Sequence, residues 1–244
     1  MQVRVEEVSK RYGKVRALDN VTLDFSPGQI VAVVGTNGAG KTTLLQCMAT
    51  LVSPTKGQVL LDGEPLRRDL LGLRRRLMFL PDFPVAYGTM SPLRHIAMVL
   101  RLYEKDHPDI QERAAEVLTS FDLLPLIDTP MARLSRGQIY KTVLSAMVLV
   151  DPELWLLDEP IASGMDPAGI MYLKQHCHAA TRRGRTIIYS TQLLEIAENF
   201  SDRVCVLHRG GVQAFEGVEE MRKRTSKPQG ALEEIFRQLR ETSA

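Results

Sequence analysis

A glycine-rich segment near residue 40 combines the residue types that bind a nucleotide's phosphates. Glycines let successive backbone N–H groups point at phosphate oxygens, Lys41 adds a positive charge, and Thr42 offers a hydroxyl to Mg²⁺. An ordinary glycine-rich turn would match the full pattern by chance in about one chain in a hundred of this length. We therefore assign to the phosphates the segment and the residue after it, which read Gly35-Thr36-Asn37-Gly38-Ala39-Gly40-Lys41-Thr42-Thr43.

Two adjacent carboxylates end a later apolar run, residues 154–157. Asp158 can hold Mg²⁺ through water, and Glu159 can polarise the water that attacks the terminal phosphate. Either acid alone would be an ordinary strand end. Together with the phosphate loop, the pair favours an ATPase over a module that only binds the nucleotide.

A third segment, Leu134-Ser135-Arg136-Gly137-Gln138, has the composition of a helix start. Small residues there expose backbone N–H groups and the positive end of the helix dipole to an anion, although a simple capped helix explains the pentapeptide equally well by itself. In its place between the other two motifs, the segment resembles the Leu-Ser-Gly-Gly-Gln signature of the ABC ATPase family. The resemblance implies that Ser135, Gly137 and Gln138 contact the γ-phosphate of ATP held by a second ABC ATPase subunit. Two subunits, identical or different, would then close head to tail over two nucleotides.

The resemblance covers nearly the whole chain. Tyr12 matches an aromatic residue that stacks on adenine in the family, with a core tyrosine as the alternative. The segment from Ser163 to Pro167 matches a loop that communicates across the dimer. The tail, residues 232–236, is similar to the C-terminal end of cassettes from prokaryotic exporters of drugs, lipids and polysaccharides.

Three residues depart from the family pattern. Arg136 replaces the first signature glycine. Asp82 stands where the family has a glutamine that reaches Mg²⁺, and its shorter, charged side chain is still a hard oxygen ligand. Gln192 replaces a histidine that hydrogen-bonds the γ-phosphate, and an amide can donate there but cannot become cationic. We therefore expect slow turnover with ATP binding retained. The expected magnesium ligands are Thr42, Asp82 and Asp158, and the expected catalytic residues are Glu159 and Gln192.

The elements that position these residues follow from hydrophobic patterning. Period-2 or continuous apolar runs bounded by turn residues predict strands over 3–8, 17–25, 30–34, 58–63, 154–157, 186–189 and 204–207. Helical spacing predicts helices over 42–51, over 92–100 after the N-cap Ser91, from about Pro108, over 139–150 and over 167–183.

Strands that alternate with helices predict an α/β fold with a mostly parallel sheet. The resemblance implies the P-loop NTPase fold of an ABC ATPase, with an N-terminal antiparallel β subdomain. We expect the ATPase domain at residues 1–217, a helical subdomain inserted at about 83–150, and a C-terminal helical tail at 218–244.

The composition argues against several classes of protein. Of the 244 residues 44% are hydrophobic and 25% charged, and the formal net charge of +2 gives no reason to expect a nucleic-acid partner. The basic run at 74–76 is interpreted as a solvated helix face. The longest apolar run, 142–150, is far shorter than the about 20 residues of a membrane-spanning helix. His176 and His178 lie two apart on an expected helix and so face apart, which disfavours a metal site.

We expect the ATP-hydrolysing subunit of an ABC transporter, an exporter by the similarity of its tail, with ATP and Mg²⁺ as its cofactors. A transmembrane permease subunit would carry the transport path and insert a short helix into a groove near Asp82 and residues 83–100. The subunit would then lie at the cytoplasmic side of the plasma membrane through this partner.

Three alternatives stay open. An ATP-gated ABC clamp with slow or no hydrolysis is favoured by Asp82 and Gln192, but not by Glu159. A soluble ABC ATPase of repair or translation would usually show a tandem cassette or a coiled-coil insertion. A small-molecule kinase would share the phosphate loop but would leave residues 135–138 unexplained.

Overall fold

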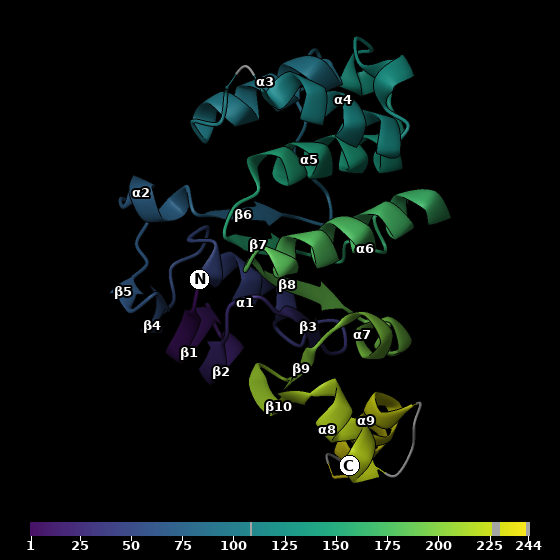
Figure 1. The fold of residues 1–244 in the computed structure, drawn as a ribbon. Coiled ribbons are helices and arrows are strands. Elements are labelled where there is room, and N and C mark those ends of the chain that lie inside the picture. Colours follow the sequence, from purple (N-terminus) through teal and green to yellow (C-terminus); the bar gives the residue numbers. More distant parts are fainter. Residues whose placement is uncertain (108, 226–229, 243–244) are drawn as a thin grey trace.

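A computed structural model describes residues 1–107, 109–225 and 230–242. Its centre is a six-stranded sheet in the order β10-β9-β3-β8-β7-β6, in which β10 is antiparallel to β9 and the other neighbours run parallel (Figure 1). This confirms the mostly parallel sheet that the sequence predicts. The strands are β3 (Ile30–Val34), β6 (Leu77–Leu80), β7 (Leu154–Leu157), β8 (Thr186–Thr191), β9 (Arg203–His208) and β10 (Gly211–Gly217).

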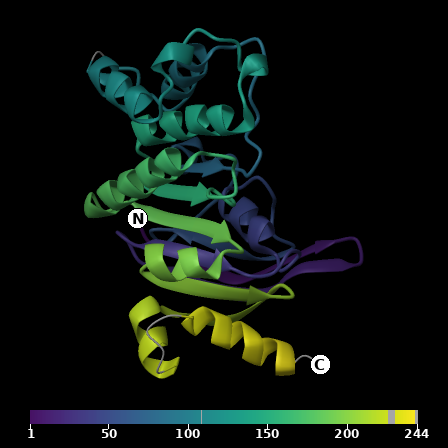
Figure 2. The ribbon, with the colours of Figure 1, turned by 90° about the vertical axis from the view of Figure 1, so that its right-hand side faces the viewer.

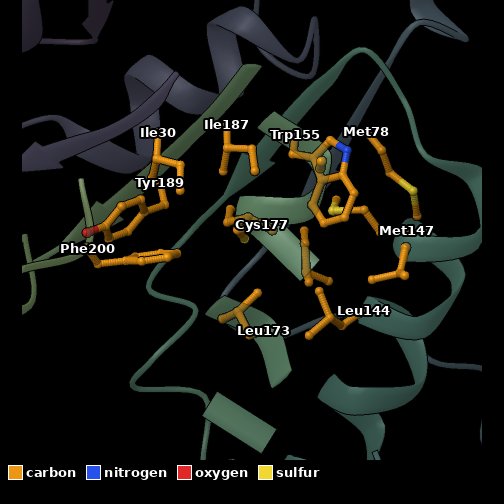
Figure 3. Packing of buried hydrophobic residues seen from close by; sticks show 14 of the residues in the cluster. Ile30, Met78, Leu144, Met147, Trp155, Leu173, Cys177, Ile187, Tyr189 and Phe200 are labelled. Carbon is orange, nitrogen blue, oxygen red and sulfur yellow. The ribbon is translucent and has the colours of Figure 1, made fainter. Parts of the chain in front are cut away.

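The residues of β3 alternate between two hydrophobic clusters, one on each face of the sheet. Ile30 and Ala32 belong to a cluster with most of the helices, whereas Val31 and Val33 belong to a cluster with the N-terminal strands. A strand buried on both faces reads as a continuous apolar run, which is why the sequence locates β3 and β7 correctly. Figure 3 shows the first cluster, with Trp155 fully buried in it, as expected for core packing.

A second sheet is antiparallel throughout and has the order β2-β1-β4-β5. It shares a hydrophobic cluster with helix α1 (Lys41–Met48), which follows the phosphate loop. The helix ends three residues earlier than the sequence predicts, and Thr50 beyond it has a positive φ of 59°. The strands of this sheet are β1 (Val3–Tyr12), β2 (Val15–Phe25), β4 (Lys56–Leu61) and β5 (Glu64–Pro65).

Three α-helices between β6 and β7 gather at one end of the molecule (Figures 1 and 2). They are α3 (Pro92–Leu102), α4 (Ile110–Ser120) and α5 (Arg136–Val150), and both α3 and α4 contact α5. Ser91 caps α3 by accepting the N–H of Arg94, as its position before a proline predicts. Short 3₁₀ segments, 124–126 and 131–133, connect α4 to α5. The proposed boundaries of the inserted subdomain, the ATPase domain and the tail stay predictions.

The C-terminal helices lie at the opposite end, next to β10 (Figure 1). Glu198, buried on α7 (Leu194–Phe200), accepts the N–H groups of Gly230 and Leu232 at 3.0 and 2.5 Å and so caps the last helix. Leu232 and Ile235 join the main hydrophobic cluster. The remaining helices are α2 (Leu71–Arg74), α6 (Pro167–Arg182), α8 (Val218–Thr225) and α9 (Ala231–Thr242), and no described helix is long and apolar enough to cross a membrane.

The basic run at 74–76 is only partly the solvated helix face that its sequence predicts. Arg76 lies beyond the end of α2 and donates to both carboxylate oxygens of Glu153 at 2.8 Å and to Asp62. The hydrogen bond from Arg76 holds the pKa of Glu153 below its usual value. These contacts link the N-terminal sheet to the start of β7.

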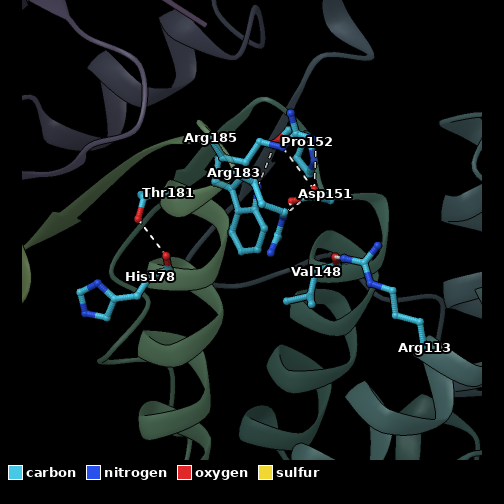
Figure 4. A network of polar contacts seen from close by, with 9 residues as sticks. Arg113, Val148, Asp151, Pro152, His178, Thr181, Arg183 and Arg185 are labelled. Atoms are coloured by element: carbon cyan, nitrogen blue, oxygen red, sulfur yellow. Dashed lines mark hydrogen bonds and ion pairs between the residues drawn. The ribbon is translucent and has the colours of Figure 1, made fainter.

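Asp151 joins two loops at the edge of the core sheet where β7 and β8 begin (Figure 4). It ends α5 with a left-handed φ of 49°, and its carboxylate accepts four hydrogen bonds from Arg183 and Arg185, at 2.9 to 3.3 Å. Burial alone would raise the pKa of Asp151, but the two guanidinium groups outweigh it and lower the pKa.

We predict that Asp151→Asn lowers the free energy of unfolding by about 1–2 kcal/mol at pH 7, because it weakens charge-assisted hydrogen bonds while asparagine still accepts the left-handed backbone. The folded-state pKa is depressed, so this stabilisation is present above the unfolded pKa of about 4 and is lost as the pH falls through the folded pKa. Urea denaturation at pH 7 and at acid pH measures the difference. Asp69→Asn, which removes an exposed charge, is the control, and an Asp151→Asn deficit that persists unchanged in acid would contradict this account.

Candidate active site

Most of the residues that the sequence assigns to the nucleotide line one cavity of about 460 Å³. It opens where parallel strands β3, β6, β7 and β8 end, which is the edge at which α/β sheets bind ligands. Each strand contributes the segment that follows it. The lining residues are Tyr12, Val15, Arg16, Ala17, the loop and helix start from Asn37 to Thr43, Asp82, Asp158, Glu159 and Gln192.

Two glycines of the phosphate loop are required by their surroundings. A Cβ on Gly35 would lie 2.4 Å from the backbone oxygen of Leu207, at the end of the neighbouring strand β9. A Cβ on Gly40 would lie 2.4 Å from the oxygen of Ala17, and Gly40 also has a φ of 107°. The loop is therefore held close to β9 and β2, with its backbone at the mouth of the cavity.

Lys41 is buried at the start of α1 and already has partners within the loop. Its Nζ donates to the carbonyl oxygens of Gly35 and Thr36 at 2.9 and 3.3 Å and lies 3.5 Å from Oε1 of Glu159. The ammonium thus sits between the loop and the carboxylate expected to polarise water. Gly35 and Thr36 do not line the cavity; they hold the lysine.

Thr42, Asp158 and Asp82 supply oxygens of the kind that Mg²⁺ prefers. The hydroxyl of Thr42 donates to both carboxylate oxygens of Asp158, at 3.1 and 2.9 Å. Asp82 lines the same cavity. A hydroxyl and two carboxylates beside a phosphate loop fit the hard oxygen donors of a magnesium site.

Ser190, the last residue but one of strand β8, connects the two acidic residues, and sequence reasoning missed it. It is fully buried, its hydroxyl donates to Oδ1 of Asp158 at 2.6 Å, and it accepts the backbone N–H of Glu159 at 2.9 Å. That N–H belongs to a residue with a left-handed φ of 47°. A serine at a strand end has no local signal of such a role, because its partners lie about thirty positions earlier in the chain.

The first residues of α5 form a capping box. The hydroxyl oxygen of Ser135 accepts the N–H of Gln138 at 3.2 Å, and Oε1 of Gln138 accepts the N–H of Ser135 at 2.9 Å. The Ser135 hydroxyl hydrogen stays available to an anion. Ser135, Gly137 and Gln138 do not line the cavity around Lys41, so one chain does not bring its two expected phosphate-binding elements together.

The helix start is fastened to the loop after β7. A Cβ on Gly137 would lie 2.3 Å from the backbone oxygen of Gly164. Lys141, buried one turn further along α5, donates to Asp166 at 2.6 Å, and Asp166 also caps α6. The pKa of Asp166 is lowered, first by its hydrogen bond from Lys141.

Tyr12 and Gln192 complete the cavity from its rim. Tyr12 ends β1 and is 47% exposed, with Nζ of Lys10 lying 5.0 Å from its ring centroid, so it is not a core tyrosine. An exposed ring beside the phosphate loop is free to stack on a base. Gln192 is exposed directly after β8 and lines the cavity with Glu159.

The two histidines of α6 contact different aromatic rings. His176 packs on Phe121 with ring centroids 5.6 Å apart, and His178 packs on Phe200 at 5.4 Å. Each imidazole therefore has a packing role on its own side of the helix.

A family model described as "ABC transporter" matches residues 18–162, more than half of the chain. This chain belongs to the ABC transporter family. It carries the ATP-binding elements of that family, whose ATPases hydrolyse ATP, dimerise and pair with permeases. The resemblance to the ABC ATPase family is thereby confirmed, and the roles assigned to single residues stay predictions.

The relatives of this ATP-binding subunit include proteins named for export and proteins named for import. It is 28% identical over 240 residues to the ABC-type transporter ATP-binding protein EcsA of Bacillus subtilis, covering 98% of this chain and 97% of EcsA. It is 30% identical to the SkfA peptide export ATP-binding protein SkfE of the same organism, covering 91% and 94%. It is also 31% identical to the sulfate/thiosulfate import ATP-binding protein CysA 2 of Rhizobium meliloti, covering 91% of this chain and 61% of CysA 2.

Solved ABC cassettes share the fold over most of the chain. The structure of an ATP-binding subunit of an ABC transporter superimposes with a TM-score of 0.91 at 27% identity, covering 98% of this chain and 99% of the other. The cassette MJ0796, as a dimer in a post-hydrolysis state with ADP and phosphate, gives a TM-score of 0.77 at 25% identity over 88% and 98%.

We predict that Ser190→Ala lowers ATP turnover about tenfold or more while ATP binding is retained, because Asp158 and Glu159 lose the hydroxyl that orients them. Steady-state hydrolysis and titration with a fluorescent ATP analogue measure the two quantities. Ser201→Ala is the matched control, since it removes a hydroxyl that bonds Tyr189 away from the cavity. Equal turnover in Ser190→Ala and wild type would refute this role.

Proposed function

We propose that this subunit hydrolyses ATP to drive export through a transmembrane permease. The observation that carries the proposal is the single cavity in which Lys41, Thr42, Asp158, Glu159 and Gln192 meet. It has a group for each task of a phosphate-loop ATPase: a phosphate-binding cation, metal ligands and a carboxylate to polarise water.

In this proposal Tyr12 stacks on adenine, and the loop from Gly35 to Thr43 holds the phosphates. Thr42, Asp82 and Asp158 would hold Mg²⁺, which when bound neutralises charge on the phosphates. Glu159 accepts a proton from the attacking water, and its backbone is fixed for this by Ser190. The left-handed φ of Glu159 is a strained conformation of the kind that active sites retain.

We further propose that two subunits, identical or different, close head to tail, with Ser135, Gly137 and Gln138 of one facing the γ-phosphate held by the other. Two features of the chain support this. The helix start at Ser135 lies outside the cavity of its own chain, and its hydroxyl can still donate. The MJ0796 cassette, similar in fold, is dimeric with its products bound.

A permease surface is proposed next to Asp82, which would place the subunit at the cytoplasmic side of the plasma membrane. Phe83, Val85 and Tyr87 are 67%, 81% and 57% exposed, although they are large and apolar. Such side chains in one loop are typical of a protein interface. Export is favoured by the tail at 232–236 and by the name of SkfE, which aligns over nearly its full length; CysA 2 is an import protein.

The second candidate, an ATP-gated clamp with little or no hydrolysis, is supported by Gln192 at the rim of the cavity. Glu159 favours the hydrolytic alternative, because a clamp needs no carboxylate beside the terminal phosphate. A variant at each position separates the two.

Glu159→Gln is expected to lower turnover about a hundredfold or more and to retain ATP binding, because the amide cannot accept the proton of the attacking water. Phosphate release and fluorescent ATP titration are the measurements. Glu112→Gln, an exposed change on α4, serves as the control. If wild type and Glu159→Gln are equally inert but bind ATP, the clamp is the correct function.

Gln192→His is expected to raise turnover about tenfold or more, because an imidazole can donate to the γ-phosphate and become cationic as charge develops. The rate under saturating ATP and Mg²⁺ is the measurement, with Gln213→His on β10 as the control for an added surface histidine. Equal turnover in wild type and Gln192→His would contradict the proposal that Gln192 slows ATP hydrolysis.

A further inference from the structure

Two of the three departures from the family pattern contact each other. Nη2 of Arg136 donates to Oδ1 of Asp82 at 2.5 Å, across 54 positions of sequence. Arg136 is the first residue of α5, and Asp82 follows β6 at the nucleotide cavity. A family glycine and glutamine at these positions could not form an ion pair.

Arg136 touches both loops that flank it. Its guanidinium carbon lies 3.9 Å from the ring centroid of Phe83, next to Asp82. Its aliphatic carbons lie 3.9 to 4.0 Å from the Cβ position of Gly164, in the loop after β7. One side chain thus connects the start of α5 with the loops that follow β6 and β7.

The ion pair is too exposed to be a device for stability. The side chains of Arg136 and Asp82 are 42% and 30% exposed, and pairs of this kind shift an equilibrium by only a few-fold. The buried Lys141 next along α5 holds that helix to Asp166 independently. A weak contact that the fold does not need is one that a ligand can open.

The contact would compete with Mg²⁺ for Asp82. Asp82 lines the cavity with Thr42 and Asp158, and a guanidinium on its carboxylate disfavours a second cation there. Under the proposed head-to-tail closure, the γ-phosphate on the second subunit would reach the start of α5, where the helix dipole favours an anion, and would offer Arg136 a second anionic partner.

We propose that Arg136 is a positioning residue that withholds Asp82 from Mg²⁺ in the free subunit and gives it up when the phosphate of ATP on a second subunit reaches the start of α5. The inference rests on the proposed function. It makes the metal affinity of one site depend on the closure of the dimer. Arg136 and Asp82, two departures from the family pattern, then act as one unit.

The first test is ATP binding by the full chain at a concentration at which light scattering shows a monomer. A fluorescent ATP analogue is titrated with increasing Mg²⁺. Arg136→Gln, and Arg136→Gly as the family residue, are expected to lower the Mg²⁺ concentration at half-saturation about fivefold, which is the effect of releasing an exposed pair. Arg133→Gln removes an exposed arginine nearby without freeing Asp82 and should change nothing.

Asp82→Asn distinguishes a specific pair from general charge. In that background Arg136→Gln should have no further effect on the Mg²⁺ requirement, because its target is gone. An equal shift with and without Asp82, or no shift in either arginine variant, overturns the proposal.

A second test needs neither nucleotide nor metal. Urea denaturation of wild type, Arg136→Gln, Asp82→Asn and the double variant gives the coupling between the two side chains in the apo subunit. The proposal requires a non-zero coupling there, and additivity overturns it. If coupling is found while wild type fails to bind ATP, the proposed function fails and the pair is a feature of a different site.

Discussion

A short chain of hydrogen bonds from Thr42 through Asp158 to Ser190 and the backbone of Glu159 is the contact on which the rest of the site depends. It connects three segments that are remote in sequence: the helix after β3, the end of β7 and the end of β8. Those ends meet because Leu157 is paired with Tyr189 and Val34 with Thr191 in one parallel sheet. A shift of one residue in either register would turn the acidic residues to the other face.

The two ends of the core-sheet strands differ in how their charged residues are paired. At the edge where β7 and β8 begin, the carboxylate of Asp151 is satisfied by Arg183 and Arg185, and Arg76 is satisfied by Glu153 and Asp62. At the edge where the strands end, the side chains of Lys41 and Glu159 lie 3.5 Å apart, which is a longer ion pair than those of Asp151. Charged side chains that are fully hydrogen-bonded stabilise the fold, whereas the longer Lys41–Glu159 ion pair leaves both groups able to contact a nucleotide.

Features that depend on neighbouring residues could be predicted from the sequence. Residues 30–34 and 154–157 are continuous apolar runs because both faces of these strands are buried. Ser91 predicts a helix because the N–H that it caps lies only three residues away. The roles of Ser190 and Arg136 could not be predicted, since their partners are fixed only by strand order and by the packing of α5. Strand β10 was missed because most of its residues are half-buried and show no alternation of buried and exposed positions. The phosphate loop could be predicted although it belongs to the site, because the backbone groups expected to bind the phosphates lie within the loop itself.

Under the proposed function, Asp82, Arg136 and Gln192, which depart from the family pattern, affect the rates of metal binding and ATP hydrolysis more than the affinity for ATP. Binding relies on the loop, on Lys41 and on the exposed ring of Tyr12, and these match the family pattern. Gln192 limits how well charge on the γ-phosphate is met during cleavage, and the Arg136 pair limits when Asp82 can serve the metal. The first effect would hold the closed dimer in its ATP-bound state for longer, whereas the second would delay metal binding until the dimer closes. A permease attached beside Asp82 would lie against the same loop that Arg136 holds through Phe83, so movement of that loop is where nucleotide state and transport would meet.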